Sequence, residues 1–274
     1  MLELTFGKRK LVTERPAFVM GIVNVTPDSF YSGSRGGIER ALELVEQGAE
    51  IIDIGGESTR PGFTPVSEQE ELERVIPVIC ELRQNTDVVI SVDSTKPLVI
   101  QEALKNGADI INNILSFDNI TQNDDEKNAL KWNLMTDIMA DIKKYEASVI
   151  LMHHTAGNIE EICSYLKASA EKMRSYGIPS EKIIIDPGIG FGKSFEQNVS
   201  AIKNSDKLCE LGYTVLMALS RKSSIGMMTG REVADRLSGT VTADIISVQK
   251  GAKIIRVHDV SDAIDSLNVM KFLK

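Results

Sequence analysis

The sequence predicts a (β/α)₈ barrel, an α/β fold that forms a single domain over residues 1–274. From residue 17 onward, short runs rich in β-branched apolar residues alternate with longer amphipathic segments, which is typical of repeated βα units around a buried parallel sheet. Eight such units in about 250 residues match the usual size of this barrel. The alternative fold is an open, doubly wound sheet.

The eight expected strands are apolar runs that each precede a helical stretch. They cover residues 18–24, 50–54, 88–93, 109–112, 148–152, 182–186, 214–219 and 253–257. Before them, the alternation of Leu2, Leu4 and Phe6 predicts a short N-terminal β-hairpin that closes the bottom of the barrel. Residues 117–144 make the fourth helical segment longer than its neighbours, and we interpret them as a surface elaboration.

Polar residues gather where these strands end, and their positions favour the barrel over the open sheet. They are Asn24, Asp53, Asp93, Asn112, Asp186 and the group Ser220, Arg221 and Lys222. In a barrel the C-terminal strand ends meet on one face, so residues scattered through the sequence can form one site. An open sheet would spread them along a crevice.

Composition argues against some binding partners and favours a cytoplasmic location. The net charge is −8 and no long cluster of Lys or Arg occurs, which argues against nonspecific binding to nucleic acid or anionic membranes. The N-terminus MLELTFGKRK lacks the apolar core of a signal peptide, and the chain contains no apolar run of about 18 residues that could span a membrane. Cys80, Cys163 and Cys209 lie far apart, so we expect buried, reduced thiols.

The segment 186–193, DPGIGFGK, follows a predicted strand and carries a carboxylate at its start. Its glycines and proline keep it out of regular structure and let the backbone approach a ligand. A nucleotide P-loop is excluded because Pro187 stands where the first glycine is required, and the glycine spacing does not match the dinucleotide fingerprint. An ordinary strand-to-helix turn remains the alternative interpretation.

Eight motifs in order resemble the dihydropteroate synthase family: GIVNVTPDSF, GGESTRPG, SVDS, IINN, LMH, DPGIGFGK, SRKS and RVHDV. They span residues 17–260. The resemblance implies a (β/α)₈ barrel that condenses 6-hydroxymethyl-7,8-dihydropterin pyrophosphate with p-aminobenzoate and releases pyrophosphate. It also implies Mg²⁺ as cofactor, inhibition by sulfonamides and a homodimer formed through the late helices.

The resemblance also implies a role for individual residues. The pterin would be bound by Asp93, Asn112, Met152, Asp186, Lys222 and Arg256. The diphosphate would be bound by Asn24, Thr59, Arg60, Arg256 and His258, with Asn24 also contacting the metal. The p-aminobenzoate pocket would be lined by Phe30, Pro61, Phe191, Lys222 and Ser223. Lys222, Arg256 and Asp93 would be the catalytic residues.

The chemistry of these residue types agrees with the implied roles. The pyrimidine edge of a pterin presents adjacent N–H donors, and a carboxylate such as Asp186 can accept two parallel, charge-assisted hydrogen bonds from it. Arg256 and His258 are two residues apart, so their side chains lie on the same face of the strand end and can hold a diphosphate. Each residue also has a structural alternative, since a strand-end Asp often caps a helix and Met152 alone is typical of a core.

Some features leave the function open. The first loop has Ser32 where the family often has a carboxylate, and the fourth strand has Asn113 where an Asp is usual. The alternatives are a pterin-dependent methyltransferase and a catalytically silent pterin-binding paralogue. The motif GGESTRPG and the lysine of SRKS favour the synthase, because methyl transfer releases no pyrophosphate. His153 and His154 are adjacent and should point to opposite faces, which disfavours a shared metal.

Overall fold

In the computed structural model, eight parallel strands close into a barrel, which confirms the predicted fold over the open sheet. The structure describes residues 1–25, 37–57, 65–114 and 126–273, with only the backbone described for 113, 114 and 126–135. Around the barrel the strands run β10-β3-β4-β5-β6-β7-β8-β9. Their bounds are β3 (Phe18–Asn24), β4 (Ile51–Gly55), β5 (Val89–Asp93), β6 (Ile110–Ile114), β7 (Ser148–Met152), β8 (Ile183–Asp186), β9 (Thr214–Met217) and β10 (Ile254–Val257).

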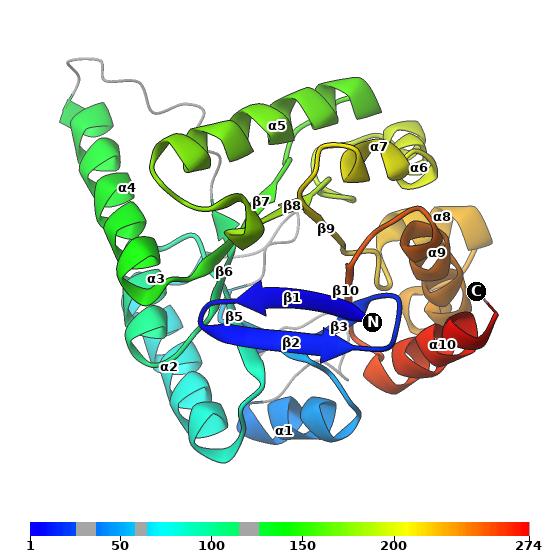
Figure 1. Cartoon of the computed structure of the whole chain (residues 1–274), viewed down its shortest axis with the longest axis horizontal. Helices are drawn as coiled ribbons and strands as arrows, with labels where there is room; N and C mark the ends of the chain where they lie inside the picture. Colours follow the sequence, from blue (N-terminus) through cyan, green and yellow to red (C-terminus); the bar gives the residue numbers. More distant parts are fainter. Residues whose placement is uncertain (26–36, 58–64, 115–125, 274) are drawn as a thin grey trace.

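Helices connect successive strands and form the outer ring seen in Figure 1. They are α1 (Ile38–Glu46), α2 (Glu68–Asn85), α3 (Pro97–Lys105), α4 (Glu126–Tyr145), α5 (Ile159–Ser175), α6 (Phe195–Lys203), α7 (Asp206–Cys209), α8 (Ser223–Thr229), α9 (Leu237–Gln249) and α10 (Val260–Phe272), with 3₁₀ turns at Ser180–Lys182 and Val233–Asp235. Ser67, Asn158 and Ser194 cap α2, α5 and α6, because each side chain accepts a hydrogen bond from the third residue of its helix.

The predicted strands agree with the structure to within about two residues at each end. The strand β8 begins later than predicted because residues 180–182 form a 3₁₀ turn. The strand β6 extends two residues further, and its register with β7 shifts between Ile111 and Ile114. Such a shift locally changes the direction of a strand.

Alternation along the strands divides the barrel interior into an apolar lower layer and a polar upper layer. Side chains two residues apart on a strand lie on the same face. Four strands carry an isoleucine in the lower layer and a polar residue two positions later: Ile51 and Asp53, Ile110 and Asn112, Ile184 and Asp186, Ile254 and Arg256. The lower layer therefore forms the barrel core, and the upper layer faces the C-terminal strand ends.

The N-terminal hairpin closes the bottom of the barrel, as predicted. The strands β1 (Leu2–Phe6) and β2 (Arg9–Thr13) pair antiparallel and lie across the barrel in Figure 1. The buried Phe6 joins the lower layer and meets Phe18 edge to face, with ring centroids 6.0 Å apart. At the hairpin turn, the Nζ of Lys182 donates to the carbonyl of Gly7, whose own N–H donates to the Oγ of Ser148.

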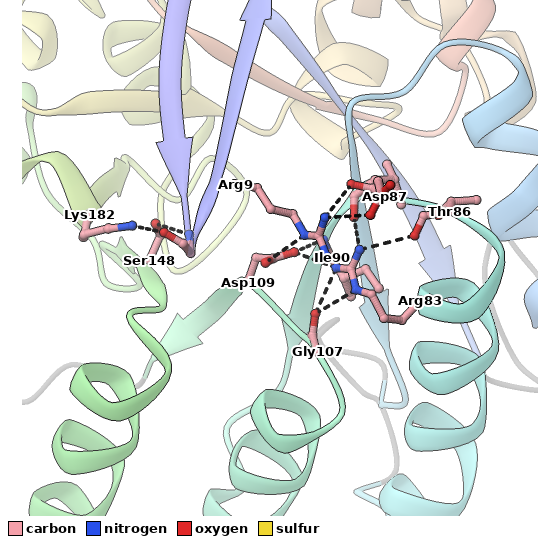
Figure 2. Close-up of polar contacts among 11 residues, drawn as sticks. Arg9, Arg83, Thr86, Asp87, Ile90, Gly107, Asp109, Ser148 and Lys182 are labelled. Carbon is pink, nitrogen blue, oxygen red and sulfur yellow. Dashed lines mark hydrogen bonds and ion pairs between the residues drawn. The ribbon is translucent and has the colours of Figure 1, made fainter.

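An ion-pair cluster fixes the hairpin to the strand starts (Figure 2). The Nε of Arg9 lies 3.3 Å from Oδ1 of Asp109, and Nη2 of Arg83 donates to Oδ2 of Asp109 at 2.7 Å. The same Oδ2 accepts from the backbone N–H of Ile90 at 3.0 Å. Asp109 is thus a buried carboxylate with two arginine partners, located at the end of the barrel opposite the polar layer.

The structure bears on two expectations drawn from the composition, the absence of a membrane span and the state of the cysteines. In the part of the chain that the structure describes, no helix is long and apolar enough to span a bilayer. Cys80, Cys163 and Cys209 are unbridged, as expected, but they are half-buried rather than buried. All three lie on the outer helices, and Cys163 and Cys209 pack at the edge of the cluster between helices and barrel.

Replacing Phe6 with Ala should lower the free energy of unfolding by about 3 to 5 kcal/mol, because it removes a buried aromatic ring and leaves a cavity in the lower layer. Urea unfolding followed by circular dichroism measures this change. Val12→Ala, at an exposed position of the same hairpin, is the matched control. A loss for Phe6→Ala no larger than that of the control would contradict the role of the hairpin as a plug.

Candidate active site

Four polar side chains of the upper layer form one hydrogen-bonded network. The Nε of Arg256 donates to Oδ2 of Asp53 at 2.6 Å, and Nη2 of Arg256 donates to Oδ2 of Asp93 at 3.0 Å. The amide of Asn112 donates to the same oxygen of Asp53 at 2.9 Å. Residues from β4, β5, β6 and β10 therefore meet inside the barrel mouth, as the strand-end pattern predicted.

Burial and charge shift the pKa values in this network. Burial, with the nearby charge of Asp53, raises the pKa of Asp93 to about 7, although Arg256 opposes the shift. Burial favours the neutral form of Arg256, but Asp53 and Asp93 outweigh it and raise the pKa of the guanidinium overall. The network thus contains one permanent cation and a carboxyl group, Asp93, that exchanges its proton near neutral pH.

The glycine run after β8 is folded around its own carboxylate. Oδ1 of Asp186 accepts the backbone N–H of Gly188 at 2.7 Å. Gly188 has φ +66°, and a Cβ at this position would lie 2.0 Å from the carbonyl oxygen of His153, so only glycine fits. Burial raises the pKa of Asp186, whereas Lys222 opposes the shift. Asp186 is a buried, largely desolvated acceptor.

Lys222 connects this loop with the network. Its Nζ donates to the carbonyl of Ile189 and lies 4.9 Å from the ring centroid of Phe191. Burial lowers the pKa of Lys222 to about 8, while Asp186 raises it. Arg256 and Asp93 also affect this pKa, which places the ammonium among the charges of the upper layer. At neutral pH the side chain is still mostly protonated.

His258 comes directly after β10, two residues after Arg256. That the two side chains share one face of the strand end stays a prediction. The backbone N–H of His258 donates to Oγ of Ser220, and its Nδ1 lies 2.8 Å from the same oxygen. Both residues are buried. Ser220 therefore fixes the orientation of the imidazole ring.

The remaining predicted site residues lie at other strand ends, at the start of α8 or outside the described residues. Asn24 and Met152 end β3 and β7 and are half-buried, and Ser223 is the exposed first residue of α8. Arg221, one of the predicted strand-end group, forms a structural ion pair with Asp259 at 2.8 Å instead of joining the network. Phe30, Ser32, Thr59, Arg60 and Pro61 lie outside the described residues, as does the side chain of Asn113.

The sequence placed Asp53 among the strand-end residues of the site without a role of its own, and no role was predicted for the side chain of Lys193. The Nζ of Lys193 donates to the carbonyls of His153, Gly188 and Phe191 at 2.8, 3.0 and 3.2 Å, which ties the glycine run to the end of β7. Burial lowers its pKa to about 8. For Asp53, the step of two residues from an apolar to a polar side chain along the strand is the sequence signal that places it inside the barrel.

The histidine pair after β7 has no arrangement suited to a metal. Burial lowers the pKa of His153 to about 4, so this side chain is neutral at physiological pH. The rings of His153 and His154 both lie edge-on to Tyr165, with centroids at 4.8 and 6.4 Å. Both rings therefore contact Tyr165, whereas the sequence predicted that they point to opposite faces. Among the described residues, no group of three or more His, Cys, Asp or Glu side chains could hold a metal ion.

Comparisons with known proteins agree with this geometry. The family model described as pterin binding enzyme matches residues 20–258. A dihydropteroate synthase of Haemophilus influenzae is 41% identical over 259 residues, covering 92% of each chain. Dihydropteroate synthase of Xanthomonas albilineans, solved with 4-aminobenzoic acid, is 38% identical with a TM-score of 0.85, covering 99% of this chain and 97% of that chain.

Two further structures carry informative ligands. The Xanthomonas albilineans enzyme in complex with 7,8-dihydropteroate is 36% identical, with a TM-score of 0.83 over 99% of this chain and 98% of that chain. Dihydropteroate synthase of Yersinia pestis, in complex with a sulfonamide drug, is 34% identical, with a TM-score of 0.85 over 99% of each chain. The present chain therefore belongs to the pterin-binding enzymes, in the dihydropteroate synthase family.

Proposed function

We propose that the upper layer binds 6-hydroxymethyl-7,8-dihydropterin pyrophosphate and joins its pterin to p-aminobenzoate, giving 7,8-dihydropteroate and pyrophosphate. The observation that carries this proposal is the network of Arg256 with Asp53, Asp93 and Asn112, located beside Asp186 and Lys222. Within one barrel mouth, this arrangement offers both hydrogen-bond donors and hydrogen-bond acceptors, and a polar heterocycle requires both.

Pterin recognition is assigned to the polar groups of the upper layer and its rim. The carboxylate of Asp186 accepts hydrogen bonds from the pyrimidine N–H donors, and Lys222 donates to the carbonyl side of the ring. Asp93 and Asn112 bind the remaining polar atoms. The side chain of Met152 and the plane of Arg256 pack on the ring faces. An analogue with a mismatched group would leave a buried partner unpaired, at a cost of about 1 to 3 kcal/mol.

The leaving diphosphate is assigned to Asn24, Arg256 and His258, together with Thr59 and Arg60, which lie outside the described residues. Arg256 uses Nε and Nη2 on the two carboxylates, and its Nη1 makes no hydrogen bond among the described residues. The amide oxygen of Asn24 suits Mg²⁺, which needs few protein ligands when a diphosphate and waters supply the others. When bound, Mg²⁺ would neutralise charge on the departing group.

The p-aminobenzoate site is assigned to the glycine run and the start of α8. Phe191 is half-buried under the ammonium of Lys222 and offers its ring for stacking on the benzoate. Ser223 is exposed and can donate to the carboxylate. Phe30 and Pro61 complete the proposed pocket. Because Lys222 borders both pockets, it links the two substrates.

The proposed reaction needs no nucleophilic side chain. The C–O bond of the pterin methylene breaks, and pyrophosphate leaves with the bonding electron pair. The resulting cation is stabilised by the pterin ring and by the carboxylates around it. The amine of p-aminobenzoate then attacks the methylene carbon and releases one proton. The acidic network around Arg256 and the buried Asp186 thus supply electrostatic stabilisation.

The proposal also covers the oligomeric state, the location and the inhibition of the protein. Exposed apolar side chains gather on the late helices, with Met227 on α8 63% exposed and Val269 and Phe272 on α10 59% and 83% exposed. Burying them between two copies would give the proposed homodimer. We also propose a cytoplasmic location and inhibition by sulfonamides that compete for the p-aminobenzoate pocket. The Yersinia pestis relative solved with a sulfonamide drug supports the proposal that sulfonamides bind.

The proposed reaction is tested by incubating the protein with the pterin pyrophosphate, p-aminobenzoate and Mg²⁺ and measuring pyrophosphate release. We expect release that depends on both substrates. A methyltransferase or a silent paralogue would bind the pterin without releasing pyrophosphate. Pterin binding with no release would therefore contradict the synthase function and favour one of these alternatives.

Replacing Asp186 with Asn should weaken pterin binding by about 1.5 to 3 kcal/mol, because it removes a charged acceptor from the ring edge. Titration calorimetry with the pterin substrate measures this loss. Asp141→Asn, which changes a buried carboxylate between α3 and α4, is the matched control. Equal affinities for Asp186→Asn and the control would refute the assignment.

Replacing Lys222 with Ala should raise the KM for both substrates and lower kcat, because the ammonium borders the pterin and the benzoate. Steady-state kinetics with each substrate varied in turn measures the effect. Lys207→Ala, an exposed lysine paired with Glu160, is the control. An effect on only one KM would assign Lys222 to that substrate alone.

A further inference from the structure

Asp53 occupies a central position in the upper layer without reaching the surface. Its relative exposure is 0%, whereas Asp93 and Arg256 retain some exposure. Its Oδ2 accepts two hydrogen bonds, from Arg256 at 2.6 Å and from Asn112 at 2.9 Å. Its Oδ1 is buried and has no partner among the described residues. A side chain enclosed in this way does not contact a substrate in the barrel mouth.

We infer that Asp53 is a positioning residue, which sets the orientation of Arg256 and Asn112 for pterin binding and diphosphate departure. This inference rests on the proposed function of the same site. It assigns Asp53 no direct contact with substrate. Its effect passes through the two side chains that it holds.

The hydrogen bonds of Asp53 connect strands that the barrel ladder does not join directly. Around the barrel, β3 separates β4 from β10, and β5 separates β4 from β6. Asp53 on β4 thus bonds across the interior to Arg256 on β10 and to Asn112 on β6. Arginine loses much rotamer freedom when it is fixed, so a buried charged acceptor keeps the guanidinium in one orientation.

Asp53 also acts through charge on its neighbour. Two carboxylates share the single guanidinium of Arg256, and the repulsion from Asp53 contributes to the raised pKa of Asp93. The other charged groups that influence Asp93 are Glu71 on α2 and Lys222 after β9. Asp53 therefore affects both the direction of the donors and the charge of the adjacent carboxyl group.

The test is Asp53→Asn, which keeps the shape but has one acceptor oxygen and an NH₂ group in place of two acceptor oxygens. The amide oxygen of Asn can take the place of Oδ2, but without the negative charge it holds the guanidinium of Arg256 and the amide of Asn112 less firmly, so both donors lose their fixed orientation. We expect kcat/KM for the pterin pyrophosphate to fall about 10- to 100-fold, since misplacement of about 1 Å can cost 10²-fold. The KM for p-aminobenzoate should change less than about twofold, because its proposed pocket does not contain these residues.

The matched control is Asp109→Asn, which changes another buried, arginine-paired carboxylate at the opposite end of the barrel (Figure 2). We expect it to lower the melting temperature without changing either KM. A fall in activity with Asp109→Asn equal to that with Asp53→Asn would mean that both act through stability alone, and would overturn the inference.

A double-mutant cycle separates positioning from an independent effect. Asn112→Ala should reduce pterin affinity strongly in the native background and only slightly in the Asp53→Asn background. Additive effects, or full activity of Asp53→Asn, would overturn the inference. These outcomes differ from failure of the proposed function, in which the unmodified protein itself would release no pyrophosphate.

Discussion

The polar layer depends on one interaction, the placement of Arg256 between Asp53 and Asp93. Two carboxylates in a low-dielectric interior repel each other and lose hydration, and either effect alone would destabilise the fold. The guanidinium compensates because its planar donors reach both carboxylates at once. Without this cation, the strand ends could not bring so many acidic and amide groups into one barrel mouth.

The same strands provide stability and chemistry, but at different heights. Each isoleucine of the lower layer packs against its neighbours and the hairpin, and two positions later the strand presents a polar side chain. The step of two residues along an extended chain is therefore the geometric link between the core and the site. The arginine cluster around Asp109 provides the corresponding closure at the other end, where charge serves the hairpin.

Much of the fold could be predicted from sequence, because strand and helix periodicities are local and the strand ends carry polar residues. Asp93, Asn112 and Arg256 were correctly expected to converge. The exact partners could not be predicted, because Arg256 bonds to Asp93 and Asp53, which precede it in the sequence by 163 and 203 positions. Arg221 illustrates the limit, because its sequence position resembles that of Lys222 but its side chain pairs with Asp259. That residues 1–274 form one domain stays a prediction.

The glycine run after β8 has little regular structure, yet three carbonyl contacts from Lys193 and the tight fit of Gly188 against His153 hold it in place. A loop that is already fixed loses little conformational entropy when a ligand binds, so more of the contact energy is available for affinity. The cost is adaptability. In the proposed p-aminobenzoate site, a loop held this firmly would favour one shape of aromatic acceptor and could not readily reshape itself around a bulkier one.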